Sequence, residues 1–163
     1  MAKTGAKPAP FTPYAIPKFS LPSSDGTTVS DDSLKGHWTV IFFYPADNTP
    51  TCTTEACDFS NAAPEFARLG VNLYGLSKDP LKDHGKFIAK YGLKMPLLSD
   101  ETTETIAAFG AWIEKSLYGR DYMGTDRSTY VIDPEGLVRQ EWRKVRTKGH
   151  VDQVLEAVKA LAG

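Results

Sequence analysis

The chain has little of several features that mark whole classes of protein. Its 163 residues include only two cysteines, Cys52 and Cys57, too few for a disulfide framework, and their CxxxxC spacing matches neither a CxxC redox motif nor a zinc pattern. No apolar run approaches the roughly 18 residues that cross a membrane. The net charge is −1 without a long block of either sign, which argues against nucleic acid or a membrane surface as partner.

Histidine is also scarce, and the three histidines are scattered. His37, His84 and His150 lie far apart in the chain, so each is interpreted as structural or solvated, and neither a metal site nor a Ser-His-Asp set is predicted. Hydrophobic residues make up 41% and charged residues 24% of the chain, which is typical of a soluble globular protein. The length is sufficient for one domain with a proper core.

The first eighteen residues differ in composition from the rest. They contain three lysines, no arginine, no apolar core segment, and prolines at Pro8, Pro10, Pro13 and Pro17. This pattern fits neither a signal peptide nor a transit peptide, so a cytoplasmic protein is expected. The prolines favour an extended arm. We therefore predict an N-terminal arm over residues 1–18 and a single domain over residues 19–163.

The stretch from Tyr44 to Phe59, YPADNTPTCTTEACDF, predicts a strand-to-helix junction. It follows the apolar run HWTVIFFY at residues 37–44, which is typical of a strand buried on both faces of a sheet. Pro45 ends this strand. Pro50 suits the first position of a helix, which makes Thr49 the N-cap and places Cys52 in the first helical turn.

This position predicts that Cys52 is a reactive thiol. A cysteine reacts as its thiolate, and the free amides and positive dipole of a helix N-terminus favour that anion. The same amides and the Thr49 hydroxyl are placed to hydrogen-bond a small polar substrate in front of the sulfur. The pattern therefore predicts a nucleophilic cysteine with an oxyanion-type pocket.

The second cysteine lies too far along the predicted helix for a disulfide. Helical residues five apart are about 8 to 9 Å apart between Cα atoms and point about 140° apart, whereas a disulfide needs less than about 7 Å. Pro64 removes the amide that would bond the Ser60 carbonyl, so the turn carrying Cys57 is expected to be weak. Our hypothesis is that local unwinding lets Cys57 reach an oxidised Cys52.

The remaining segments predict a mixed sheet with helices on both faces. A strand at 71–77 after the first helix favours parallel pairing, and Asp-Pro-Glu-Gly between the segments 127–132 and 137–142 predicts an antiparallel hairpin. Helices are expected at 81–91, 103–109 and from about residue 150, a short link or strand at 96–100, and a small hairpin of residues 19–21 and 27–29. The segment 112–123 is the least regular. Its side chains either form a rim around the site or belong to a surface loop, and we favour the loop: Lys115, Tyr118, Arg120 and Tyr122.

At these residues the chain resembles a known family. Pro45, Thr49 and Cys52 fit the Pro-x-x-x-Thr-x-x-Cys signature of peroxiredoxins, and DNTPTCTTEACDF is similar to the active-site segment of the bacterioferritin-comigratory, or PrxQ, subfamily. The segments VNLYGLSKD, PLLSD, RSTYVIDPEG and GHVDQVLEAV resemble that subfamily in the same order, so that the similarity covers roughly residues 19–161. The resemblance implies an α/β, thioredoxin-like fold.

The resemblance also implies a role for each matching residue near the nucleophile. Cys52 matches the peroxidatic cysteine, whose thiolate attacks one oxygen of hydrogen peroxide or an organic hydroperoxide and becomes a sulfenic acid. Thr49 matches the residue that hydrogen-bonds the peroxide, and Pro45 the residue that shields the sulfur from solvent. These assignments make the chain a thiol-dependent peroxidase.

Three further residues match positions outside this signature. Arg127 matches the active-site arginine that stabilises the thiolate and the developing charge on oxygen, and Glu55 matches a position that orients this arginine. Cys57 is similar to the resolving cysteine of some members, which implies an intramolecular Cys52–Cys57 disulfide. The family implies thioredoxin or a similar dithiol protein as reductant and no bound cofactor. A monomer is expected because one chain holds both cysteines.

Two other functions remain as alternatives. The first is a thiol-disulfide oxidoreductase acting on protein disulfides, which the wide cysteine spacing disfavours. The second is a non-enzymatic redox sensor or holdase that uses the same fold to bind clients, a role that would persist after Cys52→Ser. Peroxide consumption distinguishes the peroxidase from both.

Overall fold

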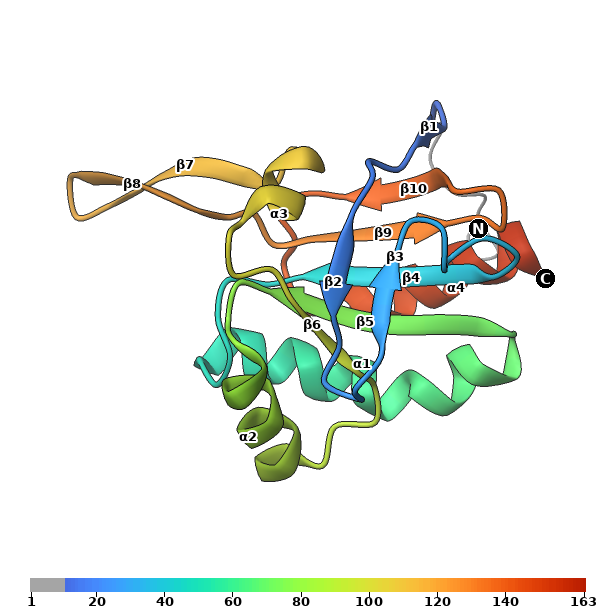
Figure 1. The fold of residues 1–163 in the computed structure, drawn as a ribbon, viewed down its shortest axis with the longest axis horizontal. Coiled ribbons are helices and arrows are strands. Elements are labelled where there is room, and N and C mark those ends of the chain that lie inside the picture. Colours follow the sequence, from blue (N-terminus) through green and yellow to red (C-terminus); the bar gives the residue numbers. More distant parts are fainter. Residues whose placement is uncertain (1–10) are drawn as a thin grey trace.

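A computed structural model describes residues 11–163 of the chain. The first ten residues of the expected arm lie outside the described residues. The core of the fold is a six-stranded sheet with the order β1-β10-β9-β4-β5-β6 (Figure 1). Its strands are β1 (Tyr14–Ala15), β4 (Trp38–Phe43), β5 (Val71–Ser77), β6 (Leu97–Ser99), β9 (Ser128–Ile132) and β10 (Leu137–Trp142).

The sheet is mixed, as the sequence predicted. The strands β4, β5 and β6 are parallel, whereas β9 runs antiparallel to β4 and β10 antiparallel to β9. The hairpin predicted from Asp-Pro-Glu-Gly is therefore confirmed. Strand β1 lies within the expected arm and pairs with β10 at the edge of the sheet. The boundary after residue 18 stays a prediction.

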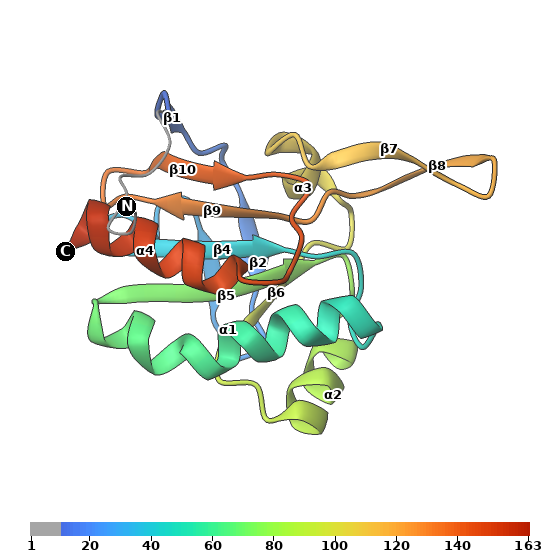
Figure 2. The same cartoon turned by 180° about the vertical axis from the view of Figure 1, so that it is seen from behind.

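Within residues 11–163, four helices and a small hairpin surround the sheet. Helices α1 (Pro50–Arg68) and α4 (His150–Ala162) pack on one face, seen in Figure 2. Helix α3 (Glu104–Ala108) and the hairpin of β2 (Ser20–Pro22) and β3 (Thr28–Ser30) pack on the other face, seen in Figure 1. Helix α2 (Leu81–Tyr91) follows β5. These elements confirm the predicted helices and the small hairpin within one or two residues.

The alternation of side chains along β4 explains why both faces need a cover. Val40, Phe42 and Tyr44 point into the core beneath α1, whereas Ile41 and Phe43 point into the core beneath α3, because successive side chains of a strand face opposite ways. All five side chains are fully buried. A strand buried on both faces reads as one apolar run, which is why HWTVIFFY lacks a polar alternation.

Helix α1 is anchored to this strand by aromatic stacking. The rings of Phe42 and Phe59 lie 4.2 Å apart between centroids and are nearly parallel, at 6°. The helix begins at Pro50, continues through Pro64 and ends at Arg68. Gly70 follows it with a left-handed φ of 74°. The first turn of α1 is thus held at the carboxyl end of β4.

The segment 112–123 is a β-hairpin, so the prediction of a surface loop was wrong. Strands β7 (Trp112–Leu117) and β8 (Arg120–Thr125) pair only with each other and project from the sheet (Figure 1). Tyr118 and Gly119 form the turn with φ values of 53° and 77°. A two-residue turn with both φ values positive normally carries Asn or Asp first, and tyrosine at this position concealed the signal.

Within residues 11–163, no helix combines the length and the apolar character that crossing a membrane requires.

Candidate active site

The site lies where β4 ends and α1 begins. Thr49 is the N-cap of α1, as predicted, with extended backbone angles of −90° and 155°, and Pro50 occupies the first helical turn. The Thr49 side chain makes no capping hydrogen bond; its hydroxyl instead donates to the Ala46 carbonyl at 3.1 Å. The lone pairs of this hydroxyl therefore stay available as acceptors. Pro45 is half-buried in the connecting loop.

Cys52 lies in the first turn of α1 with its side chain inside the protein. It is 2% exposed, and its thiol is free. The first amide that bonds within the helix is that of Thr53, which donates to the Thr49 carbonyl. The amides of Thr51 and Cys52 precede it and have no helical acceptor. The sulfur thus belongs to a helical turn that has two free backbone donors and the positive end of the helix dipole.

Arg127 reaches Cys52 because of the strand pairing. In the antiparallel pair of β4 and β9, Phe43 lies opposite Ser128, so the residue preceding Ser128 lies at the end of β4 where α1 begins. One guanidinium nitrogen of Arg127 donates to the Cys52 Sγ at 3.3 Å, and another to the Glu55 Oε1 at 2.7 Å. Three residues named from the sequence are therefore in direct contact.

Glu55 is buried beneath this arginine. It lies one turn after Cys52, and its side chain is 1% exposed. Burial raises the pKa of Glu55 to about 7, and the attraction of Arg127 opposes only part of that rise. Its Oε2 atom has no hydrogen-bond partner among the described residues. Burial alone would lower the pKa of Arg127, but Glu55 and Cys52 raise it above its usual value, so the cation is retained.

Cys57 lies on the same intact helix, away from Cys52. It is half-buried, packs against the core beneath α1, and is a free thiol. Burial raises the pKa of Cys57, and the charge of Asp58 adds to this effect. In this state Cys57 is a protonated, weakly reactive thiol, and the two sulfur atoms lie on an unbroken helix.

Sequence reasoning missed Asp47 and His84 near the site, and for Lys115 it favoured a loop over the rim of the site. Burial lowers the pKa of Lys115, on β7, while the charge of Asp126 opposes this change. Arg127 lowers the pKa further and Cys52 opposes it, so this lysine lies near the site. His84 and Asp47 form a buried contact behind the Thr49 loop. The position of His84 on the apolar face of α2 indicated burial, but its partner depends on the tertiary fold.

Comparison with known proteins agrees with this geometry. The model of the AhpC/TSA family matches residues 14–141. The chain belongs to the AhpC/TSA family. Peroxiredoxin Bcp of Xanthomonas campestris pv. campestris is 45% identical over 150 residues, which are 92% of this chain and 94% of that protein.

Solved structures are similar over the same extent. A structure of Xanthomonas campestris peroxiredoxin Q superposes with a TM-score of 0.85 at 46% identity, covering 89% of this chain and 92% of that one. A structure of the bacterioferritin comigratory protein of the same organism, described as giving insight into its alkyl peroxide reduction activity, has a TM-score of 0.84 at 45% identity and the same coverage. The predicted resemblance to the PrxQ peroxiredoxins and their thioredoxin-like fold is confirmed.

Proposed function

We propose that this peroxiredoxin reduces hydrogen peroxide and organic hydroperoxides through Cys52. The observation that carries the proposal is the Arg127 guanidinium, which hydrogen-bonds both the Cys52 sulfur and the Glu55 carboxyl group in a buried site. A fixed cation at this position stabilises a thiolate and the negative charge that develops on oxygen. The alkyl peroxide reduction described for the Xanthomonas campestris protein supports the organic part of this substrate range.

The residues of the site have distinct roles in this reaction. The Cys52 thiolate attacks one peroxide oxygen, the O–O bond breaks, and the sulfur becomes a sulfenic acid while the leaving oxygen takes a proton to give water or an alcohol. Thr49 and the free amides of the first turn hold the peroxide, and Pro45 excludes solvent. Arg127 stabilises the charge moving onto oxygen, and Glu55 positions Arg127.

The second step forms the Cys52–Cys57 disulfide. The Cys57 sulfur attacks the sulfenic acid of Cys52, and water leaves. Since both residues lie on one continuous helix, the first turns of α1 must unwind before the sulfur atoms meet. Unwinding also removes the burial that raises the pKa of Cys57. The missing amide at Pro64 weakens the helix beyond Cys57 and favours this step.

Thioredoxin or a similar dithiol protein then reduces the disulfide. Peroxiredoxins as a family take their electrons from thiol donors, and the assignment to a dithiol protein is part of our proposal. We propose further that the protein is a cytoplasmic monomer, because both cysteines of the cycle lie in one chain and neither step needs a partner subunit.

Mass spectrometry of the reduced protein after one equivalent of hydrogen peroxide tests the cycle. We expect each chain to lose two hydrogen atoms, the loss to map to a Cys52–Cys57 crosslink, and thioredoxin to reverse it. A stable sulfenic acid at Cys52 beside a free Cys57 would keep the peroxidase but assign resolution to an external thiol. Absence of any reaction would contradict the proposed function.

The Cys57→Ser variant separates the two steps. We expect its first oxidation by peroxide to proceed at the wild-type rate, because Cys57 has no role in the attack on peroxide, whereas turnover with thioredoxin should stall. Stopped-flow oxidation and steady-state peroxide consumption measure these two properties. Normal cycling of the variant would show that Cys57 is not the resolving cysteine.

The same experiments distinguish the alternative functions. An oxidoreductase would reduce a protein disulfide substrate without consuming peroxide, and a holdase would keep its activity in Cys52→Ser. The arginine–sulfur contact favours the peroxidase over both, since neither alternative requires a cation that stabilises charge on a peroxide oxygen.

A further inference from the structure

We propose that Asp47 and His84 form a positioning pair that holds the loop before Cys52 in its reactive place. The inference rests on the proposed peroxidase function and adds two residues to its site that the Pro-x-x-x-Thr-x-x-Cys signature does not specify. The pair joins the loop between β4 and α1 to helix α2 and strand β6, and so acts on the reaction through Thr49 and Cys52.

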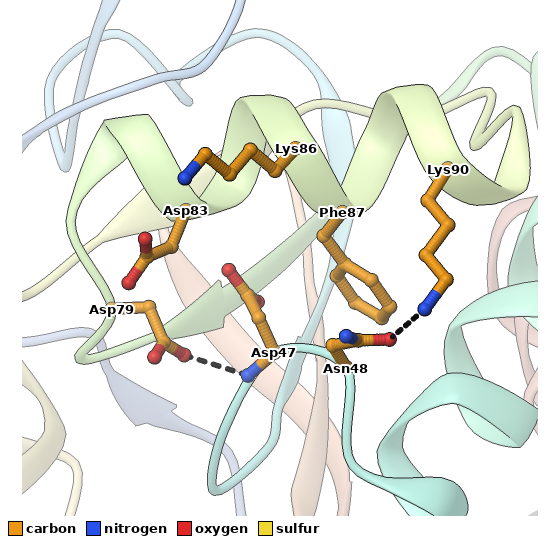
Figure 3. Close-up of a pocket in the computed structure, with 7 residues that line it drawn as sticks. All are labelled: Asp47, Asn48, Asp79, Asp83, Lys86, Phe87 and Lys90. Atoms are coloured by element: carbon orange, nitrogen blue, oxygen red, sulfur yellow. Dashed lines mark hydrogen bonds between the residues drawn. The ribbon is translucent and has the colours of Figure 1, made fainter.

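The pair is buried and closely hydrogen-bonded. The Nδ1 atom of His84 lies 2.7 Å from the Oδ2 atom of Asp47, and its Nε2 atom lies 2.8 Å from the Leu98 carbonyl oxygen. The His84 side chain has no exposed surface, and that of Asp47 is 6% exposed. In Figure 3 Asp47 lies beneath α2, between Asp79 and Phe87, at the floor of a pocket of about 190 Å³.

These contacts determine how many protons the pair holds. The Leu98 carbonyl oxygen only accepts, so Nε2 of His84 carries a hydrogen. The short contact between Nδ1 and the Asp47 carboxyl oxygen needs a second hydrogen, because two lone pairs at that distance would repel. The pair therefore binds one proton more than a neutral imidazole beside a carboxylate, either as imidazolium and carboxylate or as imidazole and carboxylic acid.

Both carboxyl oxygens and the amide of Asp47 are used to fix this point of the loop. The Tyr44 hydroxyl donates to Oδ1 at 2.6 Å, His84 binds Oδ2, and the Asp47 amide donates to the Asp79 carboxylate at 2.8 Å. Asp79 is in turn bonded by the Ser77 hydroxyl at the end of β5. Asp47 is thus held from the ends of β4 and β5, from α2 and from β6 at once.

The fixed residue lies close to the reacting atoms along the chain. Only Asn48 separates Asp47 from Thr49, the N-cap of α1, and Asn48 has a left-handed φ of 62°. The Asn48 side chain accepts a bond from Lys90 of α2 (Figure 3). It also accepts one from Tyr91, but it is exposed. The buried Asp47–His84 contact is therefore the main attachment, and a shift of Asp47 displaces Thr49 and the first turn of α1.

The two chemical steps should respond differently when this attachment is lost. Reaction with peroxide needs Thr49, the first-turn amides and Arg127 in a fixed arrangement, and small displacements of such groups cost large factors in rate. Formation of the Cys52–Cys57 disulfide instead begins with unwinding of α1 and does not need that arrangement. Loosening the loop should slow the peroxide step and leave the disulfide step as fast or faster.

Three substitutions test the pair. Asp47→Ala and His84→Leu remove it and leave buried polar groups unpaired. Asp47→Asn keeps its shape, since the amide oxygen accepts from Tyr44, the amide nitrogen donates to Nδ1 of a neutral His84, and Nε2 still donates to Leu98. The control is His37→Leu, the same exchange at an exposed histidine.

The measurements are the oxidation rate of Cys52 by hydrogen peroxide and its alkylation rate by iodoacetamide, both in the reduced protein. We expect Asp47→Ala and His84→Leu to slow oxidation by about tenfold or more. Both should accelerate alkylation, because the loop exposes the buried sulfur. Asp47→Asn should stay within about threefold of wild type in both rates, and His37→Leu should match wild type.

The result that overturns the inference is a lower unfolding midpoint in Asp47→Ala and His84→Leu with both Cys52 rates unchanged, which would make the pair merely structural. Asp47→Asn as slow as Asp47→Ala would overturn it too. If a variant does not fold, NMR of the wild-type protein decides: a Nδ1 atom of His84 that shares no hydrogen with the Asp47 carboxyl group contradicts the pair. Wild type that fails to react with peroxide contradicts the proposed function instead, while alkylation and NMR still test the pair.

Discussion

Glu55 combines burial with incomplete pairing at the centre of the site. One carboxyl oxygen bonds Arg127 at 2.7 Å, and the other has no partner among the described residues. Burying a carboxylate with one hydrogen-bonded cation costs stability that the ion pair does not fully recover, which agrees with a pKa of about 7. The contact is thus explained by the position it gives Arg127 rather than by stability.

Replacement of Glu55 by glutamine tests whether the carboxylate charge is needed to orient Arg127. The amide oxygen of Glu55→Gln still accepts from Arg127, but a neutral acceptor holds a guanidinium about half as strongly as a charged one. We expect the peroxide oxidation of Cys52 to slow about tenfold because the arginine is less firmly oriented. Stopped-flow measurement of Cys52 oxidation checks this.

Glu65 provides the control for that exchange. It lies on the same helix and pairs with Arg68 on the surface at 2.7 Å, where an ion pair contributes less than about 1 kcal/mol. Glu65→Gln should leave the oxidation rate unchanged. An unchanged rate in Glu55→Gln as well would show that the carboxylate charge has no part in orienting the arginine.

Strand β5 carries a glycine, Gly75, at a point where the core leaves no room for a side chain. A Cβ atom at Gly75 would lie 2.7 Å from the Leu97 side chain and 2.8 Å from the Phe42 ring. Phe42 also carries the ring of Phe59 and hence helix α1. Close packing between β5, β6 and the helix that holds Cys52 therefore requires glycine at this point.

Gly75→Ala should destabilise the fold by about 1 to 3 kcal/mol, the usual range for an overpacked core. Gly85→Ala is the matched control, since a Cβ at Gly85 in α2 meets nothing within 4 Å and alanine favours a helix by up to about 1 kcal/mol over glycine. Urea unfolding of both variants measures the difference. Equal stabilities would show that the core adapts to the extra methyl group.

Considered as a whole, the molecule contains two buried groups whose titrations oppose each other. Burial lowers the pKa of His150 to about 4 and raises that of Glu55 to about 7. As the pH falls from about 6.5 to 4, the unfolded chain takes up the histidine proton that the folded protein refuses, so stability is lost. As the pH falls from about 7 to 4.5, the folded protein takes up the glutamate proton first, so stability is gained.

The two effects should nearly cancel in the wild-type protein and separate in Glu55→Gln. Each shift corresponds to about 3 kcal/mol. We expect the free energy of unfolding of Glu55→Gln to fall by about 3 kcal/mol more than that of wild type between pH 7 and pH 4, in urea unfolding at several pH values. Parallel pH profiles for the two proteins would contradict the assignment to these residues.

The sequence was sufficient to predict those parts of the site whose residues are neighbours in the chain. Pro45, Thr49, Pro50 and Cys52 are neighbours in the sequence, and strand ends, caps and first turns depend on short-range backbone geometry. The junction of strand and helix, the buried character of β4 and the family were therefore predicted correctly. The hairpin of β7 and β8 was missed because Tyr118 is an unusual residue at its turn.

Contacts between distant segments depended on the packing of the sheet. Arg127 is 75 residues from Cys52 and reaches it only because β9 runs antiparallel to β4, and His84 meets Asp47 only because α2 packs behind the loop. A sequence pattern specifies which side chains are apolar or reactive, but the register between strands follows from the whole core. The sequence by itself therefore determined the residue types and the local structure, whereas tertiary packing brought the charged groups close to the sulfur.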